Sequence, residues 1–325
     1  MARAFTIGIV SDIHFASDAE QARGDDYEIN AVSHPALRLL LRAYRHFIWL
    51  RHPLRQNHLL DHFIDHLGPV DFVVANGDYS CDSGFMGVSD EASFQSATLC
   101  LARLRSRFGT AFQATMGDHE LGKFSFVGGR GGMRIKSFHR AQRDLGLEPF
   151  WKQDLGHYVL MGVTSSLISL PVLKSETLQE EFPEWQQLRE AHLENIRQAF
   201  SELRSSQRVL LFCHDPTALP FLWQEEPVRQ RAAQIERTII GHLHSPLIFW
   251  KSRLLAGMPR IKFLGHSIQK MSQALHEARH WKAFHVCHCP SLAGIELLKD
   301  GGFFTLELPA LEPASTTLTR HRIAR

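Results

Sequence analysis

Five short apolar runs of the chain each end in a cluster of glycine, aspartate and histidine, and this repeated pattern constrains the fold more than any other feature. In chain order the clusters are SDIH, NGD, GDHE, CHD and GHLH. Apolar runs of this length predict buried strands, and the longer amphipathic segments between them predict helices. Strands that alternate with helices predict an α/β architecture around a largely buried sheet.

The expected elements form one domain, since no linker or internal repeat is visible. We expect this domain to cover 1–308, with a helical insertion over 31–67 after the first strand and a loose polar tail over 309–325. The helical patterns cover 35–50, 56–67, 90–107 and 184–205. The strand patterns lie within 5–10, 70–78, 111–120, 157–166, 208–216, 237–245, 260–267, 283–291 and 301–308.

Composition excludes several classes of protein. The chain has 325 residues, of which 44% are hydrophobic and 22% charged, so it can bury a sizeable core and is not globally disordered. A net charge of +2 gives no argument for a nucleic-acid-binding protein. Five cysteines without regular spacing predict reduced thiols. With no signal peptide and no apolar run long enough to span a bilayer, we expect a cytoplasmic protein.

The five clusters predict a metal centre if they meet in space. In α/β sheets, sites form outside the carboxyl ends of the strands. Three carboxylates and five imidazoles on one rim would be costly unless cations neutralise them. Histidine and carboxylate ligands suit manganese first, with iron, zinc or magnesium as alternatives, and so many ligands fit two ions that share a carboxylate. The candidates are Asp12, His14, Asp78, Asp118, His119, His214, His242 and His244.

Local spacing supports this prediction. On an extended segment Asp12 and His14 point to one side, and His242 and His244 repeat the pattern. A glycine precedes three of the clusters' polar residues and permits a sharp turn after the strand. Each cluster taken alone is explained as an ordinary turn or helix start. Five of them in this order, each after an apolar run, favour a site.

The ordered set of clusters resembles the calcineurin-like metallophosphoesterase superfamily over residues 7–245. The usual pattern there is Asp-x-His, Gly-Asp, Gly-Asn-His-Glu/Asp, His and Gly-His-x-His. The resemblance implies a four-layer αββα sandwich and a two-metal site that hydrolyses phosphoesters or pyrophosphates through a metal-activated hydroxide. It implies three groups of residues: Asp12, His14 and His244 for one metal, Asp78 as the bridge, and Asp118, His214 and His242 for the other metal. By the same resemblance His119 is the catalytic residue that protonates the leaving oxygen.

Two residues of the GDHE cluster leave alternatives open. Asp118 stands where the resembled pattern has asparagine, and its extra negative charge is expected to tighten metal binding and to repel phosphate. A non-catalytic or retuned metal-binding scaffold of the same fold is therefore the alternative to an active hydrolase. Glu120 either begins a helix, where the helix dipole favours an acid, or orients His119.

Basic segments near the clusters are candidates for substrate binding. Residues 31–60 contain no acid, and Arg38, Arg42 and Arg45 share one face of the helix expected there. This helix is either a core helix with a solvated basic face, or a platform for an anionic ligand or membrane surface. The loop over 128–136 adds Arg130 and Arg134, which either pair with anionic oxygens or lie on a flexible surface loop.

The basic helix is similar in kind to that of the UDP-2,3-diacylglucosamine pyrophosphohydrolases. This similarity implies a lipid-linked nucleotide as the phosphorylated substrate and a peripheral membrane location. A nuclease or phosphodiesterase of the same superfamily is a further alternative. It is less favoured, because no recurring mixture of aromatic and basic residues predicts a groove for nucleic acid.

Overall fold

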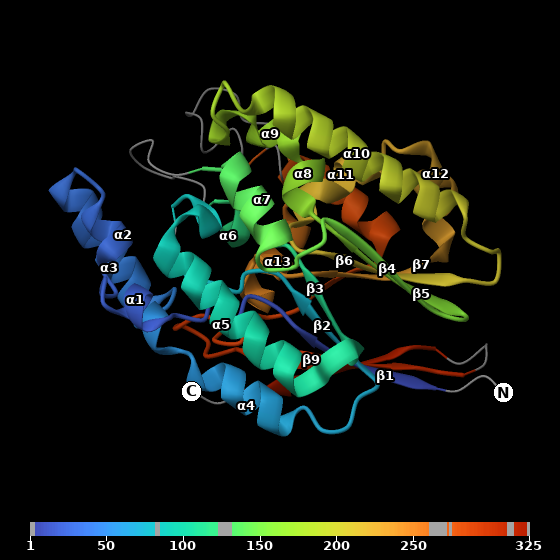
Figure 1. Ribbon diagram of the computed structural model, residues 1–325, viewed down its shortest axis with the longest axis horizontal. Helices are drawn as coiled ribbons and strands as arrows, with labels where there is room; N and C mark the ends of the chain where they lie inside the picture. The colour runs from blue at the N-terminus through green and yellow to red at the C-terminus, as the bar shows by residue number, and fades with distance from the viewer. Residues whose placement is uncertain are drawn as a thin grey trace.

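Two five-stranded sheets lie face to face at the centre of the molecule (Figure 1). The computed structural model describes residues 4–81, 85–122, 132–259, 272, 275–310 and 315–323. The first sheet has the order β10-β9-β1-β2-β3 and the second the order β4-β5-β6-β7-β8. The strands are β1 (Phe5–Val10), β2 (Phe72–Asn76), β3 (Phe112–Thr115), β4 (Phe150–Leu155), β5 (Tyr158–Val163), β6 (Arg208–Cys213), β7 (Ile235–Ile240), β8 (Val286–His288), β9 (Gly302–Leu308) and β10 (Thr317–Arg322).

Alternation along the strands builds the layers. In β2, Val74 faces the cluster between the two sheets while Val73 faces the cluster under the helices, because successive side chains point to opposite faces. In β6, Phe212 faces the inner cluster and Leu211 faces the outer helices. Helices therefore cover both outer faces, which confirms the α/β fold with an αββα arrangement of layers.

The helices divide between the two outer layers and the insertion. Those packed on the first sheet are α4 (His58–His66), α5 (Glu91–Phe108) and α7 (Ile135–Arg143). Those packed on the second sheet are α10 (Phe182–Ser201), α11 (Leu219–Leu222) and α12 (Glu226–Gln230). The other helices are α1 (Asp18–Gln21), α2 (Tyr27–Asn30), α3 (Pro35–Phe47), α6 (Asp118–Leu121), α8 (Ser165–Ile168), α9 (Leu170–Leu173) and α13 (Pro246–Leu254). Single 3₁₀ segments lie at Pro53–Arg55, Gly87–Ser89, Gly109–Ala111, Lys174–Glu176, Pro216–Ala218, Ala232–Gln234 and Ala278–Phe284.

The insertion after β1 contains the expected helices, but its packing differs from one of the two expectations. Helix α3 begins at Pro35, where the ring of His34 accepts the N–H of Leu37 and proline suits the first helical position. Not one residue of α3 is buried. The interpretation of this segment as a core helix is therefore wrong, and Figure 1 shows α2 and α3 projecting from the body of the molecule.

The prediction of a loose tail is also wrong for part of 309–325. Strand β10 pairs antiparallel with β9, from Thr317 opposite Glu307 to Arg322 opposite Gly302. Its polar side chains concealed it, because an edge strand with an exposed face needs few apolar residues once its partner accepts the backbone hydrogen bonds. Strand β4 and helices α7 and α13 were not predicted, and the predicted strand over 260–267 lies outside the described residues.

No helix in the described part of the chain is both long enough and apolar enough to cross a bilayer.

The strand directions determine where the site lies. Strands β1, β2 and β3 run parallel to each other, and so do β5, β6, β7 and β8. Within each sheet the carboxyl ends of these strands therefore share one edge.

Candidate metal centre

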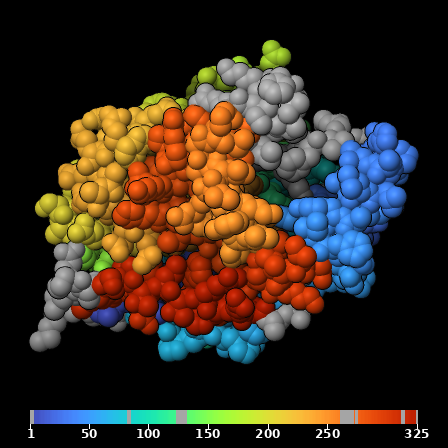
Figure 2. Space-filling model, turned by 180° about the vertical axis from the view of Figure 1, so that it is seen from behind, coloured from blue at the N-terminus to red at the C-terminus, as the bar shows by residue number. Residues whose placement is uncertain are grey.

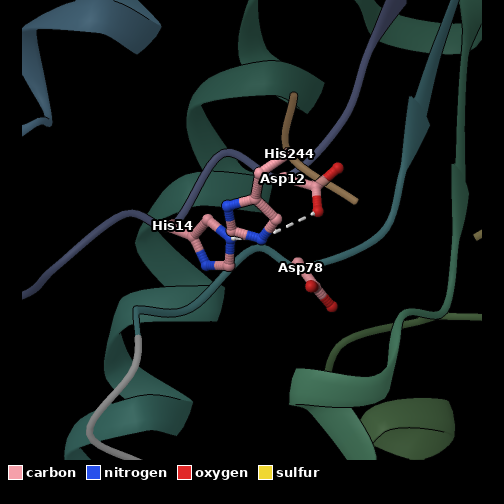
Figure 3. Close-up of side chains that lie close together, drawn as sticks. All are labelled: Asp12, His14, Asp78 and His244. Atoms are coloured by element: carbon pink, nitrogen blue, oxygen red, sulfur yellow. Dashed lines mark hydrogen bonds and ion pairs between the residues drawn. The ribbon is translucent and has the colours of Figure 1, made fainter. Parts of the chain in front are cut away.

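The first group of candidate ligands comes from three separate segments of the chain. One side-chain atom from each of Asp12, His14, Asp78 and His244 lies within 4.8 Å of the others (Figure 3). The Nε2 atoms of His14 and His244 are 3.3 Å apart, and Nε2 of His244 is 3.4 Å from Oδ1 of Asp12. Asp12 and His14 follow β1, Asp78 follows β2, and His244 follows β7. The group therefore joins the edges of both sheets.

The second group, Asp118, His214 and His242, lies beside the first. Oδ1 of Asp118 is 3.0 Å from Nδ1 of His242 and 3.2 Å from Nε2 of His214. Nε2 of His214 is also 3.0 Å from Oδ2 of Asp78, so Asp78 reaches both groups. Asp78 thus lies between the two groups, and it also forms a third, overlapping group with Asp118 and His119. Metal binding by these residues stays a prediction.

The backbone at these residues has an unusual conformation. In the described part of the chain seven non-glycine residues have positive φ, and five of them are candidate ligands: Asp12, His14, Asp78, His242 and His244, at 50° to 59°. The prediction that two of the motifs are extended is therefore wrong, although their side chains do point to one place. Non-glycine residues rarely adopt left-handed φ, and clusters of them occur at functional sites.

Backbone hydrogen bonds hold this conformation. The N–H of Asp12 donates to the carbonyl of Gly77 at 3.2 Å, and the N–H of His14 donates to the carbonyl of Asp78 at 3.0 Å. The N–H of His242 donates to Oδ1 of Asp12 at 2.9 Å. The segments after β1, β2 and β7 are thus joined to one another before any ligand binds.

The three glycines of the motifs matter mainly because they leave room. Only Gly77 has positive φ, and a Cβ there would lie 2.6 Å from Nδ1 of His214. A Cβ on Gly117 would collide with Asp78, and one on Gly241 with Ser11 and Asp12. The expectation of a sharp glycine turn holds at Gly77 alone, while the other two permit close approach of the ligand loops.

The residues fit a pair of divalent cations. Two buried atoms at the centre of the cluster, Oδ2 of Asp78 and Nε2 of His214, lie 3.0 Å apart, and neither has a hydrogen-bond partner outside the cluster. The outward nitrogens are held from behind, since Nδ1 of His214 lies 2.6 Å from the carbonyl of Asn76 and Nδ1 of His14 lies 3.2 Å from that of Ser80. Such backing contacts fix the ring and leave Nε2 to face a metal. Mixed imidazole and carboxylate donors suit manganese, iron or zinc.

The imidazoles and carboxylates of the cluster shift one another's pKa values. Burial disfavours the charged form of each of these groups. At His242 the charge of the Asp118 carboxylate outweighs burial and raises the pKa of the imidazole to about 10. Burial is likewise outweighed at Asp118, where His242 and His214 hold the carboxyl pKa well below its usual range. At Asp78, His214 and His119 lower the pKa against both burial and the charge of Asp118. Protonated imidazoles thus neutralise the carboxylates, and metal binding must release those protons.

His119 lies at the edge of the cluster. Its Nε2 is 3.9 Å from Oδ2 of Asp78, its Nδ1 is 3.5 Å from the carbonyl of Cys81, and its ring packs edge-on against His14 at 4.8 Å between centroids. Its backbone N–H donates to Oδ1 of Asp78 at 3.1 Å. The side chain is 8% exposed, so it can meet a ligand while remaining positioned by its neighbours.

Glu120 holds the loop of Asp78 rather than the ring of His119. Its carboxylate accepts the N–H groups of Gly117, Asp78 and Tyr79 at 2.9, 3.1 and 2.9 Å. The bond to Gly117 closes the first turn of α6, as the helix-start interpretation expected. The other two bonds were not predicted. Burial, reinforced by the charge of Asp78, raises the pKa of Glu120 to about 7.

The candidate substrate residues lie outside the cluster. Arg42 pairs with Asp26 at 2.9 Å and Arg45 with Glu28 at 3.1 Å, so both guanidinium groups contact the segment around α2. Arg38 is half-buried on α3. Arg134 precedes α7, and its N–H donates to the carbonyl of Leu121, one residue after Glu120. Arg130 lies outside the described residues. Substrate contact by these arginines stays a prediction.

One residue at the centre was not predicted. The indole of Trp49 packs against the ring of His244, with 4.7 Å between ring centroids, and the ring of Tyr44 stacks with Trp49 at 6.1 Å between centroids. The carbonyl of Trp49 accepts the N–H of Glu296 at 2.7 Å. No local pattern reveals this placement, because it depends on a contact between residues almost two hundred positions apart.

The model of the calcineurin-like phosphoesterase family matches residues 5–246, about three quarters of the chain and the part that carries all five motifs. The chain belongs to this family. The Asp/His cluster lies within the matched residues. No curated protein sequence matches the chain significantly.

Several solved structures are similar to the chain at low identity. A protein of Staphylococcus aureus, provisionally assigned as a 5′-nucleotidase and solved with α-ketoglutarate, is 13% identical with a TM-score of 0.43, and the match covers 99% of this chain and 54% of that one. The chain thus spans about half the length of that protein. Phosphopantetheinyl hydrolase of Mycobacterium tuberculosis is 14% identical with a TM-score of 0.36, covering 75% and 84%. A metallophosphoesterase of Sphaerobacter thermophilus is 11% identical with a TM-score of 0.32, covering 98% and 89%.

Proposed function

We propose that the protein hydrolyses a phosphoester or pyrophosphate with two divalent metal ions, manganese being the first choice. The observation that carries this proposal is the pair of adjacent ligand groups, in which Oδ2 of Asp78 from the first group lies 3.0 Å from Nε2 of His214 in the second, both atoms being buried without a hydrogen-bond partner outside the cluster. Bound divalent ions supply a nucleophilic water at neutral pH and neutralise charge on a phosphoryl oxygen.

The side chains have separable tasks in this proposal. Asp12, His14 and His244 would hold one ion, Asp118, His214 and His242 would hold the other, and Asp78 lies between the two groups. His119 moves a proton at Nε2 to the leaving oxygen, while its Nδ1 faces the carbonyl of Cys81. Glu120 keeps the loop of Asp78 in place through three backbone N–H groups.

The first experiment measures bound metal and hydrolysis together. Protein purified with manganese should contain two ions per chain and should hydrolyse a phosphomonoester, a phosphodiester or a UDP-linked pyrophosphate. His119→Ala should keep both ions and lose turnover. His139→Ala is a matched control, because His139 is an exposed histidine paired with Glu184 on the outer face of α7. Failure to bind any metal would refute the proposal.

The alternatives remain distinguishable. If metals bind, wild type hydrolyses none of the substrates and Asp118→Asn restores turnover, the protein is a retuned scaffold. Digestion of DNA with little activity on small esters would favour the nuclease. A lipid-linked nucleotide is the finer substrate prediction, and preference for the UDP-linked pyrophosphate over the simple esters would support it.

A further inference from the structure

Helix α3 is oriented opposite to the usual arrangement of an amphipathic surface helix. Such a helix normally buries its apolar face and exposes its charges. Here Arg45 is turned toward α2, where it pairs with Glu28, and only 11% of its side chain is exposed. Leu40 is 64% exposed and Phe47 65% exposed. The charged face of α3 thus packs toward the rest of the protein, and its apolar face points to solvent.

Helix α13 also exposes its apolar side chains to solvent. None of its residues is buried, and Trp250 and Leu254 are 59% and 69% exposed. Of the 13 large apolar side chains that are exposed in the described part of the chain, ten lie in α3, α13 and the residues that directly follow them or in the loop at 297–298. The ten are Leu39, Leu40, Tyr44, Phe47, Ile48, Trp250, Leu254, Leu255, Leu297 and Leu298.

The three segments are linked to one another and to the metal centre. The N–H of Leu297 donates to the carbonyl of Ile48 at 3.2 Å, which ties the loop to the end of α3. The hydroxyl of Ser245, which caps α13, donates to Asp300 at 2.7 Å at the other end of that loop. Helix α13 begins two residues after His244, and α3 ends two residues before Trp49, which packs on His244. Figure 2 shows α13 in orange and the insertion in blue on the same face of the molecule.

The exposed charged side chains within these three segments are cationic, whereas the acids that flank the loop, Glu296 and Asp300, are half-buried. Residues 31–60 and 246–255 contain no acid. The exposed cations beside the apolar side chains are Arg51, Lys251, Arg253 and Lys299. Apolar side chains that are bordered by cations match the two layers of an anionic bilayer surface, where acyl chains lie beneath negative headgroups.

We infer that α3, α13 and residues 297–299 form a docking surface for an anionic lipid bilayer. Docking does not require hydrolysis. The corollary that it brings the metal centre to phosphoesters held in the bilayer rests on the proposed function.

The test measures co-sedimentation of the full chain with vesicles of phosphatidylcholine and phosphatidylglycerol in equal parts. We expect wild type to bind these vesicles more tightly than vesicles of phosphatidylcholine alone, and salt to weaken the binding. The double variant Leu40→Ser/Phe47→Ser should bind at least about tenfold more weakly. Lys251→Ala/Arg253→Ala should lose about tenfold on the anionic vesicles only. Leu99→Ser is the matched control, since Leu99 is 47% exposed on α5 away from the docking surface.

Three results would overturn the inference. Wild type that binds neither kind of vesicle would do so, and so would equal losses of binding in the Leu99 control and the α3 variant. A dimer in sedimentation equilibrium that Leu40→Ser/Phe47→Ser dissociates, without vesicle binding, would show that a second copy covers this surface. Hydrolysis of a soluble phosphomonoester, measured on the same samples, separates failure of docking from failure of the proposed function.

Discussion

Replacing Asp118 by asparagine tests the electrostatic account of the metal-free site. Oδ1 of Asp118 lies 3.0 Å from Nδ1 of His242, and this carboxylate is the main reason that the pKa of His242 is raised to about 10 against the effect of burial. Two unit charges at this distance interact by about 5 kcal/mol at an effective dielectric constant of about 20. That energy corresponds to about four pKa units.

Solvent screening reduces this interaction energy between Asp118 and His242. The side chain of His242 is 31% exposed, and the charge of Asp215 also raises its pKa, so part of the shift survives the substitution. We therefore expect Asp118→Asn to lower the pKa of His242 by at least about two units, to roughly 8 or below. Above that pH the variant's imidazole is already neutral, whereas that of wild type still carries its proton.

The assay is calorimetric titration of metal-free protein with manganese in two buffers of different ionisation enthalpy, which counts the protons released. Near pH 9, wild type should release about one proton more than the variant, because its His242 must lose a proton before it can bind an ion. Asp61→Asn is the control, since it removes one carboxylate from an exposed site on α4. Equal proton release by wild type and Asp118→Asn would refute this account of the cluster.

Three further predictions address stability. Glu120→Ala leaves the N–H groups of Gly117, Asp78 and Tyr79 without their acceptor, so urea unfolding should show a loss of about 3 kcal/mol, and a loss within error of zero would contradict the role given to Glu120. Burial lowers the pKa of His192 to about 3, so between pH 6.5 and 3 the unfolded chain binds a proton that the folded chain excludes. The free energy of unfolding should therefore fall as pH drops through this window, by up to about 1.4 kcal/mol per pH unit. The variant His192→Gln keeps an acceptor for the N–H of Thr164 and should flatten this pH dependence between pH 7 and 5. An unchanged pH dependence in the variant would exclude His192 as the cause. Removal of metal with a chelator should lower the unfolding free energy by about 2.7 kcal/mol per ion relative to protein in metal at a hundredfold excess over Kd, and identical melting curves would show that the folded state does not bind the ions preferentially.

The meeting of the five motifs could be predicted from sequence because parallel strands bring their carboxyl ends to one edge. The backbone conformation of the motifs could not be predicted. Asp12 and His14 are separated by one residue, which suggested an extended segment, yet both have left-handed φ. The cause is tertiary, since their N–H groups donate to the carbonyls of Gly77 and Asp78, which directly follow β2 and lie more than sixty positions away.

The orientation of α3 shows a second limit of sequence reasoning. Its period revealed an amphipathic helix, but a period does not show which face meets the protein. The carboxylates of Asp26 and Glu28 pair with Arg42 and Arg45, and Arg45 also donates to the backbone carbonyl of Asp25, so the arginine face turns toward this segment. Strand β10 was missed for a related reason, because an edge strand is defined by its partner as much as by its own residues.

The left-handed backbone of five ligands has a consequence for any mutational scan of this centre. At Asp12, His14, Asp78, His242 and His244 a replacement must satisfy two independent demands, donation to a metal and tolerance of positive φ. Asparagine and glycine meet the second demand, whereas valine and isoleucine do not. His214 and Asp118 do not have positive φ and therefore report the first demand alone. His214 and Asp118 can therefore serve as reference positions. Comparing the effect of the same replacement at the two sets of positions separates the contribution of backbone conformation from that of metal coordination.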